Sequence, residues 1–326
     1  MIITVTLNPA LDKTAYVNVM KACALNRLQK VQVDAGGKGI NVSAIIRSLG
    51  GRSITTGFAG GAAGEELLAG IAGKGLKADF VRIAGNTRTN LKVVDNSGGL
   101  TELNEPGPEI KPEEWSTMEQ KLAGYGTTGN MVVLSGSLPT GLDDNTYQKL
   151  SAMLRRRGAT VLLDTDGKAL ELALSSPPDE IPDYIKPNRT ELLRYFGMVD
   201  DDTVTEGHLI KLCQSLIDKG VKLVALSMGE DGAIFVNKKV VWRIKAIPVS
   251  IRSTVGAGDS ICGALVYGFE QGLKDEQCFA LAMAASAAAC TTEGTKEPEN
   301  ALISKLIPRV RIEKRKKFNY SITHNS

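Results

Sequence analysis

One segment of the sequence joins small residues to a carboxylate in a pattern that could support acid–base chemistry. Gly256, Ala257 and Gly258 precede Asp259, and a helical pattern follows from about Ser260 to Gln271. Small residues at a helix start let backbone N–H groups approach an anion, and the helix dipole favours negative charge there. The Asp259 carboxylate could then accept a proton from a hydroxyl beside that anion. The alternative is an acidic residue that only stabilises a helix N-terminus after a glycine turn.

A second glycine-rich segment, from Asp34 to Asn41, also opens a helix. Its glycines Gly36, Gly37 and Gly39 permit a tight backbone, and Lys38 supplies a positive charge. The spacing is neither the GxxxxGK[ST] of a P-loop nor the GxGxxG of a dinucleotide-binding turn. The segment predicts either close backbone approach to a ligand or an ordinary glycine-rich connection between a strand and a helix.

Asn188 and Glu191 lie three residues apart at the start of a helix, after the strand-like segment that ends near Lys186. Their side chains could both face one magnesium-bound water or one phosphate. The same spacing is typical of a helix cap in which the two residues bond reciprocally. The spacing alone favours the cap.

Two further candidates stand near strand ends. Ser137 follows a short apolar strand, and ligands bind at the carboxyl ends of strands in open α/β sheets. Arg88 could hold a phosphate through two parallel hydrogen bonds. Taken alone, Arg88 is more typical of a solvated side chain.

An alternation of short apolar strands and helices must position these residues. Short strands that are apolar throughout indicate a parallel sheet buried on both faces. Right-handed crossovers place the loops after such strands at one edge of the sheet, where we expect the ligand. The strand-like segments are Ile2–Leu7, Ser53–Phe58, Asp79–Ile83, Met131–Leu134, Thr160–Leu163, Asp183–Ile185 and Leu223–Leu226. The helical segments are Gly39–Leu49, Glu65–Gly73, Asn145–Arg157, Arg189–Phe196, His208–Lys219 and Ser260–Gln271.

Two segments interrupt that alternation. Lys13–Val33 contains two strand-like pieces, and Thr89–Leu103 has the pattern of a hairpin around a turn that ends in Gly98-Gly99. Together they predict a small β-structure outside the main sheet, which could be a lid or a dimer clasp. Surface hairpins without a special role are the alternative.

The composition excludes several kinds of chemistry. Only two histidines are present among 326 residues, so a histidine-rich zinc site cannot be built. Five cysteines without a CxxC pair predict reduced thiols, as in a cytoplasmic protein. No run of 18 apolar residues occurs, so we expect no membrane span.

The net charge of +3 is unevenly distributed. The segment 309–326 carries six basic residues and one acidic residue, so the remaining chain is slightly acidic. We therefore expect no nucleic-acid-binding surface on the body of the protein and interpret 309–326 as a solvated basic tail. Contact of the tail with a nucleic acid or an anionic membrane is the alternative.

Seven motifs, in this order, resemble those of the ribokinase-like (PfkB-type) family of sugar kinases. They are Thr4–Asp12, Gly36–Val42, Thr87–Asn90, Ser135–Pro139, Lys186–Glu191, Ser227–Gly229 and Thr254–Ser260, and the resemblance covers roughly residues 1–306. It implies a three-layer α/β/α fold with a mostly parallel central sheet and a small β-sheet lid. It implies a kinase domain at 1–308, lid segments at about 12–34 and 87–105, and a basic C-terminal tail at 309–326.

The resemblance also implies a role for individual residues. Asp259 matches the catalytic base, and the backbone of Gly256, Ala257 and Gly258 matches the anion hole for the transferred phosphate. The residues that match contacts to the sugar hydroxyls are Asp12, Gly37 and Asn41. Those that match the surroundings of the sugar's existing phosphate are Lys38, Arg88, Asn90 and Ser137. Those that match the nucleotide site are Lys186, Asn188, Ser227 and Gly229, with Glu191 acting on Mg²⁺ through water.

Within that family the chain is most similar to kinases of phosphorylated ketohexoses. The resemblance implies ATP and Mg²⁺ as cofactors, fructose 1-phosphate as the first candidate substrate, and a cytoplasmic homodimer paired through the lid. Tagatose 6-phosphate and fructose 6-phosphate are the alternative substrates. Among other classes, a non-catalytic binding protein would have no need of Asp259, and an NAD-dependent oxidoreductase would need GxGxxG where Asn8-Pro9-Ala10 stands.

Overall fold

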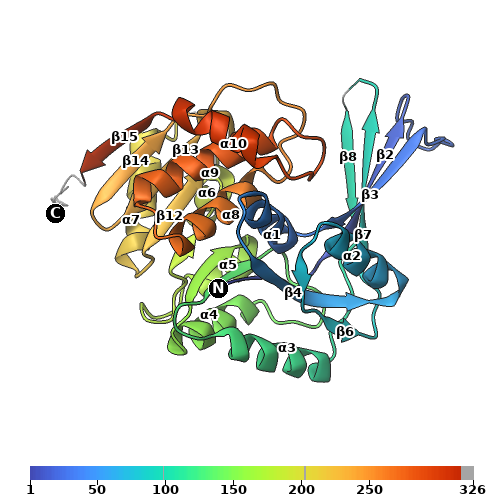
Figure 1. Ribbon diagram of the computed structural model, residues 1–326, viewed down its shortest axis with the longest axis horizontal. Coiled ribbons are helices and arrows are strands. Elements are labelled where there is room, and N and C mark those ends of the chain that lie inside the picture. The colour runs from blue at the N-terminus through green and yellow to red at the C-terminus, as the bar shows by residue number, and fades with distance from the viewer. Residues whose placement is uncertain (98, 202, 317–326) are drawn as a thin grey trace.

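Short runs of apolar and β-branched residues form most of the central sheet, which has 11 strands within the described part of the chain (Figure 1). The computed structural model describes residues 1–97, 99–201 and 203–316. In sheet order the strands are β15 (Ile312–Lys316), β14 (Val240–Ile244), β13 (Ala233–Asn237), β12 (Leu223–Ser227), β11 (Tyr184–Ile185), β10 (Thr160–Asp164), β9 (Met131–Ser135), β1 (Ile2–Thr6), β4 (Ser53–Gly60) and β5 (Lys77–Ala78), and β6 (Val81–Ile83) pairs with β4. Pairing is parallel from β5 to β12 and antiparallel beyond β12. The predicted mostly parallel sheet is confirmed.

Helices cover both faces of this sheet, because successive residues of each strand point to opposite sides. On β1, Ile3 packs into the larger core cluster with α3 to α7, whereas Ile2 packs on the other side with α1 and α8. The helices are α1 (Lys38–Ser48), α2 (Gly61–Gly73), α3 (Pro112–Tyr125), α4 (Thr146–Arg156), α5 (Gly167–Ala173), α6 (Arg189–Tyr195), α7 (Glu206–Asp218), α8 (Ala257–Glu270), α9 (Asp275–Ala289) and α10 (Asn300–Leu306). None of the helices in the described ranges is both long and apolar enough to cross a membrane.

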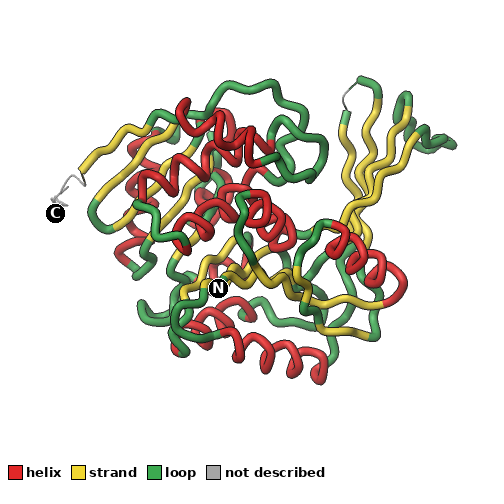
Figure 2. The backbone as a smooth tube through the Cα atoms, in the orientation of Figure 1, coloured by secondary structure: helices red, strands yellow, loops and turns green. Residues whose placement is uncertain are grey.

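A second sheet, called the small sheet below, projects from the body (Figure 2). Its strands, in sheet order, are β3 (Lys30–Gly36), β2 (Ala10–Val17), β7 (Arg88–Asp95) and β8 (Leu100–Asn104). The register places two sets of side chains on opposite faces. The polar face includes Asp12, Asp34, Asn90, Lys92 and Glu102. The apolar face includes Val31, Val33, Leu91, Val93 and Leu103.

The prediction of a solvated tail from residue 309 is wrong for the segment that forms β15. This strand pairs antiparallel with β14 and becomes an edge of the main sheet. Lys314 bonds to Glu276 at 2.7 Å, and Arg315 bonds to Glu206 at 3.2 Å. These two basic residues therefore have acidic partners that lie far away in the sequence. Residues 317–326, the remainder of the predicted tail, lie outside the described residues.

Candidate active site

Two helices begin side by side at the carboxyl edge of the main sheet. Gly256 precedes α8 with φ of +80°, a left-handed conformation that suits glycine. That turn places Asp259 in the first turn of α8, where the residue is buried. Asn41, in the first turn of α1, donates a hydrogen bond from Nδ2 to Oδ2 of Asp259 at 2.8 Å. The predicted anion site and the second glycine-rich segment therefore meet at this carboxylate.

The surroundings of Asp259 suit a proton acceptor. Burial and the negative charge of Asp164 raise the pKa of Asp259 from 3.8 to about 6, against the opposing effects of the Asn41 hydrogen bond and two lysines. A carboxyl with this pKa is a stronger base than an exposed aspartate, yet it is ionised at neutral pH. The site therefore provides a carboxylate that can accept a proton at the pH of most cells.

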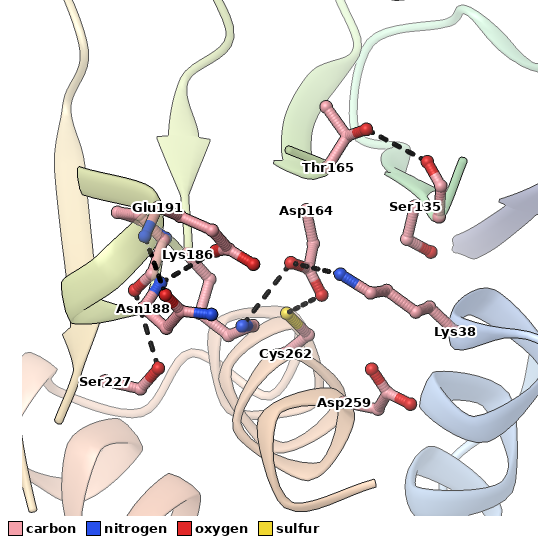
Figure 3. A network of polar contacts seen from close by, with 12 residues as sticks. Lys38, Ser135, Asp164, Thr165, Lys186, Asn188, Glu191, Ser227, Asp259 and Cys262 are labelled. Atoms are coloured by element: carbon pink, nitrogen blue, oxygen red, sulfur yellow. Dashed lines mark hydrogen bonds and ion pairs between the residues drawn. The ribbon is translucent and has the colours of Figure 1, made fainter. Parts of the chain in front are cut away.

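Asp164 is a site residue that the sequence analysis missed. It ends β10, its side chain is fully buried, and its Oδ1 lies 3.3 Å from Lys38 Nζ and 3.4 Å from Lys186 Nζ (Figure 3). Burial alone would raise the pKa of Asp164, but the two lysines hold it below its ordinary value. An aspartate that directly follows the apolar run Thr160–Leu163 was the available signal, because strand ends face the predicted site.

The two lysines at Asp164 remain able to bind an anion. Burial alone would lower the pKa of both lysines. The negative charges nearby, chiefly that of Asp164, together outweigh this effect and raise the pKa of each, so both Lys38 and Lys186 are cationic. One carboxylate cannot satisfy the six N–H donors of two ammonium groups. The cluster thus carries a net positive charge next to Asp259. The structure places Lys38 in this cluster, whereas Arg88, which was predicted to share the sugar's phosphate with Lys38, lies at the start of β7.

The predicted nucleotide residues lie around the start of α6. Asn188 and Glu191 cap this helix reciprocally: each side chain accepts a hydrogen bond from the other's backbone N–H at 2.8 Å. The cap favoured by the spacing is therefore confirmed. Ser227 ends the neighbouring strand β12 and pairs with Asn188 in a parallel bridge. Gly229 begins the short turn that follows.

The predicted sugar residues gather where the small sheet joins the body. Asp12 of β2 lies opposite Asn90 of β7, and Asn90 Nδ2 donates to Asp12 Oδ1 at 3.1 Å. The backbone at Gly36 approaches so closely that a Cβ atom there would lie 2.5 Å from the Asp12 carboxylate. Asn90 Oδ1 is buried and accepts no hydrogen bond within the described part of the chain. A ligand hydroxyl could supply that missing donor.

Arg88 and Ser137 are brought together through Asn8. The Arg88 guanidinium donates to the backbone oxygens of Asn8 at 3.0 Å and Glu105 at 2.9 Å. Asn8 Nδ2 in turn donates to Ser137 Oγ at 3.2 Å. Arg88 Nε is buried and has no hydrogen-bond partner among the described residues. Gly37 directly precedes α1, the helix that carries Asn41, with φ of +130°.

The site does not offer a metal cage made by protein alone. No group of three or more histidine, cysteine, aspartate or glutamate side chains suited to a metal occurs within the described ranges. Mg²⁺ commonly binds through one or two carboxylates, waters and substrate phosphates. The carboxylates of Asp164 and Glu191, which act on both lysines, fit that kind of binding. The nucleotide would then supply part of the metal's ligands.

A family model, curated relatives and solved structures all relate this chain to sugar or sugar-phosphate kinases. The family model described as pfkB family carbohydrate kinase matches residues 5–302. A 1-phosphofructokinase of Borreliella burgdorferi is 34% identical, over 96% of this chain and 98% of its own length. One from Xanthomonas campestris is 36% identical, over 94% of this chain and 98% of its own length. Phosphofructokinase-2 from Escherichia coli in complex with substrates and products has a TM-score of 0.88 and 28% identity, covering 94% of this chain and 98% of that chain.

Proposed function

The chain belongs to the pfkB family of carbohydrate kinases and is a phosphotransferase with an alcohol acceptor, and we propose that it acts as a 1-phosphofructokinase. The reaction would transfer the γ-phosphoryl group of ATP to the 6-hydroxyl of fructose 1-phosphate, giving fructose 1,6-bisphosphate and ADP. The observation that carries this proposal is the buried carboxylate of Asp259 beside two lysines and the N-terminus of α8. Relatives named 1-phosphofructokinase support the choice of substrate.

Asp259 would accept the proton of the attacking hydroxyl as the new P–O bond forms and the bond to the leaving ADP oxygen breaks. The backbone N–H groups at Gly256–Gly258 and the lysines at Asp164 would stabilise the charge on the transferred phosphoryl group. We therefore assign Lys38 to the transferred phosphate rather than to the sugar's own phosphate. Its 3.3 Å contact with Asp164, next to Lys186, supports this assignment.

The nucleotide would lie along the edge formed by α6 and β12. Lys186 and Asn188 would contact its phosphates, and Ser227 and Gly229 would contact the rest of it. Mg²⁺, when bound with the nucleotide, would neutralise phosphate charge. The helix cap occupies Oε2 of Glu191, so Oε1 is the atom that would accept a hydrogen bond from a metal-bound water.

The sugar would lie between the Asp259 group and the small sheet. Asp12, Gly37 and Asn41 would bind its hydroxyls, and Arg88, Asn90 and Ser137 would surround its existing phosphate. The unpartnered Nε of Arg88 and Oδ1 of Asn90 support this placement, because a bound phosphate and hydroxyl would satisfy them.

Steady-state kinetics with fructose 1-phosphate, fructose 6-phosphate and tagatose 6-phosphate test the proposal. We expect the highest kcat/KM with fructose 1-phosphate. A higher value with one of the other two phosphates would reassign the substrate within the same chemistry. A preference for unphosphorylated fructose would refute the phosphosugar assignment altogether.

We also propose that the small sheet acts as a lid and pairs two chains into a homodimer in the cytoplasm. Its apolar face leaves Val31, Val33 and Leu103 41%, 41% and 55% exposed. A second copy of the same face would cover these side chains. The cytoplasm is proposed because sugar phosphates do not cross membranes freely and the five cysteines of the sequence form no CxxC pair.

A further inference from the structure

Lys92 lies on the polar face of the small sheet, one step beyond the residues assigned to the sugar. Arg88, Asn90 and Lys92 alternate along β7 and therefore point to the same side. The residue paired with Asn90 on β2 is Asp12, and the residue paired with Lys92 on β8 is Glu102. This register sets the Lys92 ammonium between two carboxylates.

The Lys92 side chain is largely buried, but its ammonium is only loosely paired. Its Nζ lies 3.7 Å from Asp12 Oδ2 and 3.9 Å from Glu102 Oε1, and its side chain is 14% exposed. Both distances exceed those of a hydrogen bond. An ammonium has three N–H donors, and neither carboxylate is close enough to accept a hydrogen bond from them. Lys92 therefore presents donors that the described part of the protein does not satisfy.

The charges around Lys92 explain why a cation is needed there. The polar face carries the carboxylates of Asp12, Asp34 and Glu102, and Asp12 is assigned to the sugar hydroxyls. A sugar phosphate brings about two further negative charges, which these carboxylates would repel. Of the other nearby cations, Lys38 contacts Asp164, and Arg88 donates to two backbone oxygens and keeps only Nε for the phosphate, so Arg88 by itself offsets one of these two charges.

We propose that Lys92 is a specificity-determining residue for the phosphorylated sugar. Its ammonium neutralises Asp12 and donates hydrogen bonds to the bound sugar phosphate. An unphosphorylated sugar gains less from Lys92, because it carries no charge for the ammonium to offset. This inference rests on the proposed function, since it requires a ketohexose phosphate at Asp12.

The experiment compares Lys92→Met, Lys92→Gln and Lys92→Arg with the unmodified enzyme. We expect Lys92→Met to raise the KM for fructose 1-phosphate at least ten-fold, while the KM for ATP and kcat change less than three-fold. The ratio of kcat/KM for fructose 1-phosphate to that for unphosphorylated fructose should fall by a similar factor. Lys92→Arg should restore most of the affinity, and Lys92→Gln, which keeps donors without charge, should restore little.

Lys30→Met is the matched control, because Lys30 lies on the same face but its ammonium stands over the Tyr16 ring, 5.4 Å from the centroid. It should leave the KM for fructose 1-phosphate within two-fold. An equal rise with Lys30→Met, or a fall in kcat alone in Lys92→Met, would overturn the proposal. An unchanged KM in a folded Lys92→Gln variant would do the same. If the unmodified enzyme phosphorylates no ketohexose phosphate, the proposed function itself has failed, which the same assay reports separately.

Discussion

Asp164 and Asp259 are both buried, yet their surroundings shift their pKa values in opposite directions. Two lysines hold the pKa of Asp164 below its ordinary value, whereas burial and Asp164 itself raise that of Asp259 to about 6. Such a divergence separates the roles of neighbouring carboxylates. Asp164 remains ionised and positions the lysines, and Asp259 is the group able to exchange a proton near neutral pH.

Replacing Asp259 by Asn removes the proposed proton acceptor with little change in shape. We expect kcat to fall by about 10²- to 10⁴-fold, the usual contribution of a positioned general base. Binding of ATP, measured by calorimetry, should change only a few-fold. Turnover within ten-fold of the unmodified enzyme would contradict the assignment of the base.

The melting temperature of the same variant, measured at two pH values, is the control for correct folding. The pKa of Asp259 is higher in the folded protein than in the unfolded chain, so proton binding by Asp259 favours the folded state at low pH. This stabilisation is lost as the pH rises from about 4 through 6. Above that window the buried charge is unfavourable. Asp259→Asn should therefore raise the melting temperature at pH 8 more than at pH 4. Lower stability at both pH values would mean that a general defect, rather than loss of the base, explains the lost turnover.

The pH dependence of activity tests the coupling between the two aspartates. In the unmodified enzyme, kcat/KM should fall as pH drops below about 6, because Asp259 becomes protonated. Asp164→Asn should lower kcat and move this acid limb to lower pH, since it removes a negative charge that raises the pKa of Asp259. Asp183→Asn is the control, because Asp183 is also buried beside cations but supports Val161 near the start of β10. An acid limb that stays in place in Asp164→Asn would contradict the coupling.

At the scale of elements, most strands of the parallel sheet were predictable because they are short runs rich in apolar and β-branched residues, but β5 (Lys77–Ala78) was not, since it is short and exposed. The contacts between elements were not. Asp164 and Lys38 are 126 residues apart, so no local spacing reports their ion pair. Strand β15 was missed for a related reason, because its partners Glu206 and Glu276 lie on distant helices. The sequence pattern likewise predicts no element at α3, α5, α9, α10 or the β13–β14 hairpin.

Within the small sheet, β3 approaches the Asp12 carboxylate of β2 closely at Gly36. Gly36→Ala should displace the Asp12 carboxylate, because the added Cβ would lie 2.5 Å from it. We expect a higher KM for the sugar phosphate and an unchanged KM for ATP. Gly73→Ala is the control, since a Cβ at Gly73 has no atom within 4 Å. Equal kinetics for Gly36→Ala and Gly73→Ala would argue against a role of Asp12 in sugar binding.

Removal of β15 should affect stability more than activity. A chain truncated after Arg311 loses the strand that pairs with β14 and the packing of Ile312 against the core. Its melting temperature should fall by about 2–4 °C for each kcal/mol lost, the usual relation for domains of moderate size. Truncation after Lys316 keeps β15 and should leave the melting temperature unchanged. Equal melting temperatures for the two truncations would show that β15 contributes nothing.

At the scale of the whole molecule, the small sheet exposes apolar residues on one face, while the other face carries Asp12 and Asn90, which are proposed to bind the sugar. Strand β8 carries one exposed leucine on each face. Leu103 is 55% exposed on the apolar face, and Leu100 is 54% exposed on the opposite face. Leu103→Glu should weaken the proposed dimer, because it would bury a charge at the interface. Leu100→Glu should not. Sedimentation velocity over a range of concentrations measures the difference, and a dimer unaffected by Leu103→Glu would place the interface elsewhere.

The position of β1 between β4 and β9 has a consequence for the order in which the protein can assemble during translation. Ile2 pairs with Ser53 on one side and with Met131 on the other. Strand β1 therefore cannot pair on both sides until the ribosome has synthesised β9 and this strand has left the exit tunnel. Until then, β1 is an apolar strand without its second neighbour, and such unpaired strands favour aggregation. We infer that nascent chains of this kinase depend on chaperones most strongly before β9 emerges.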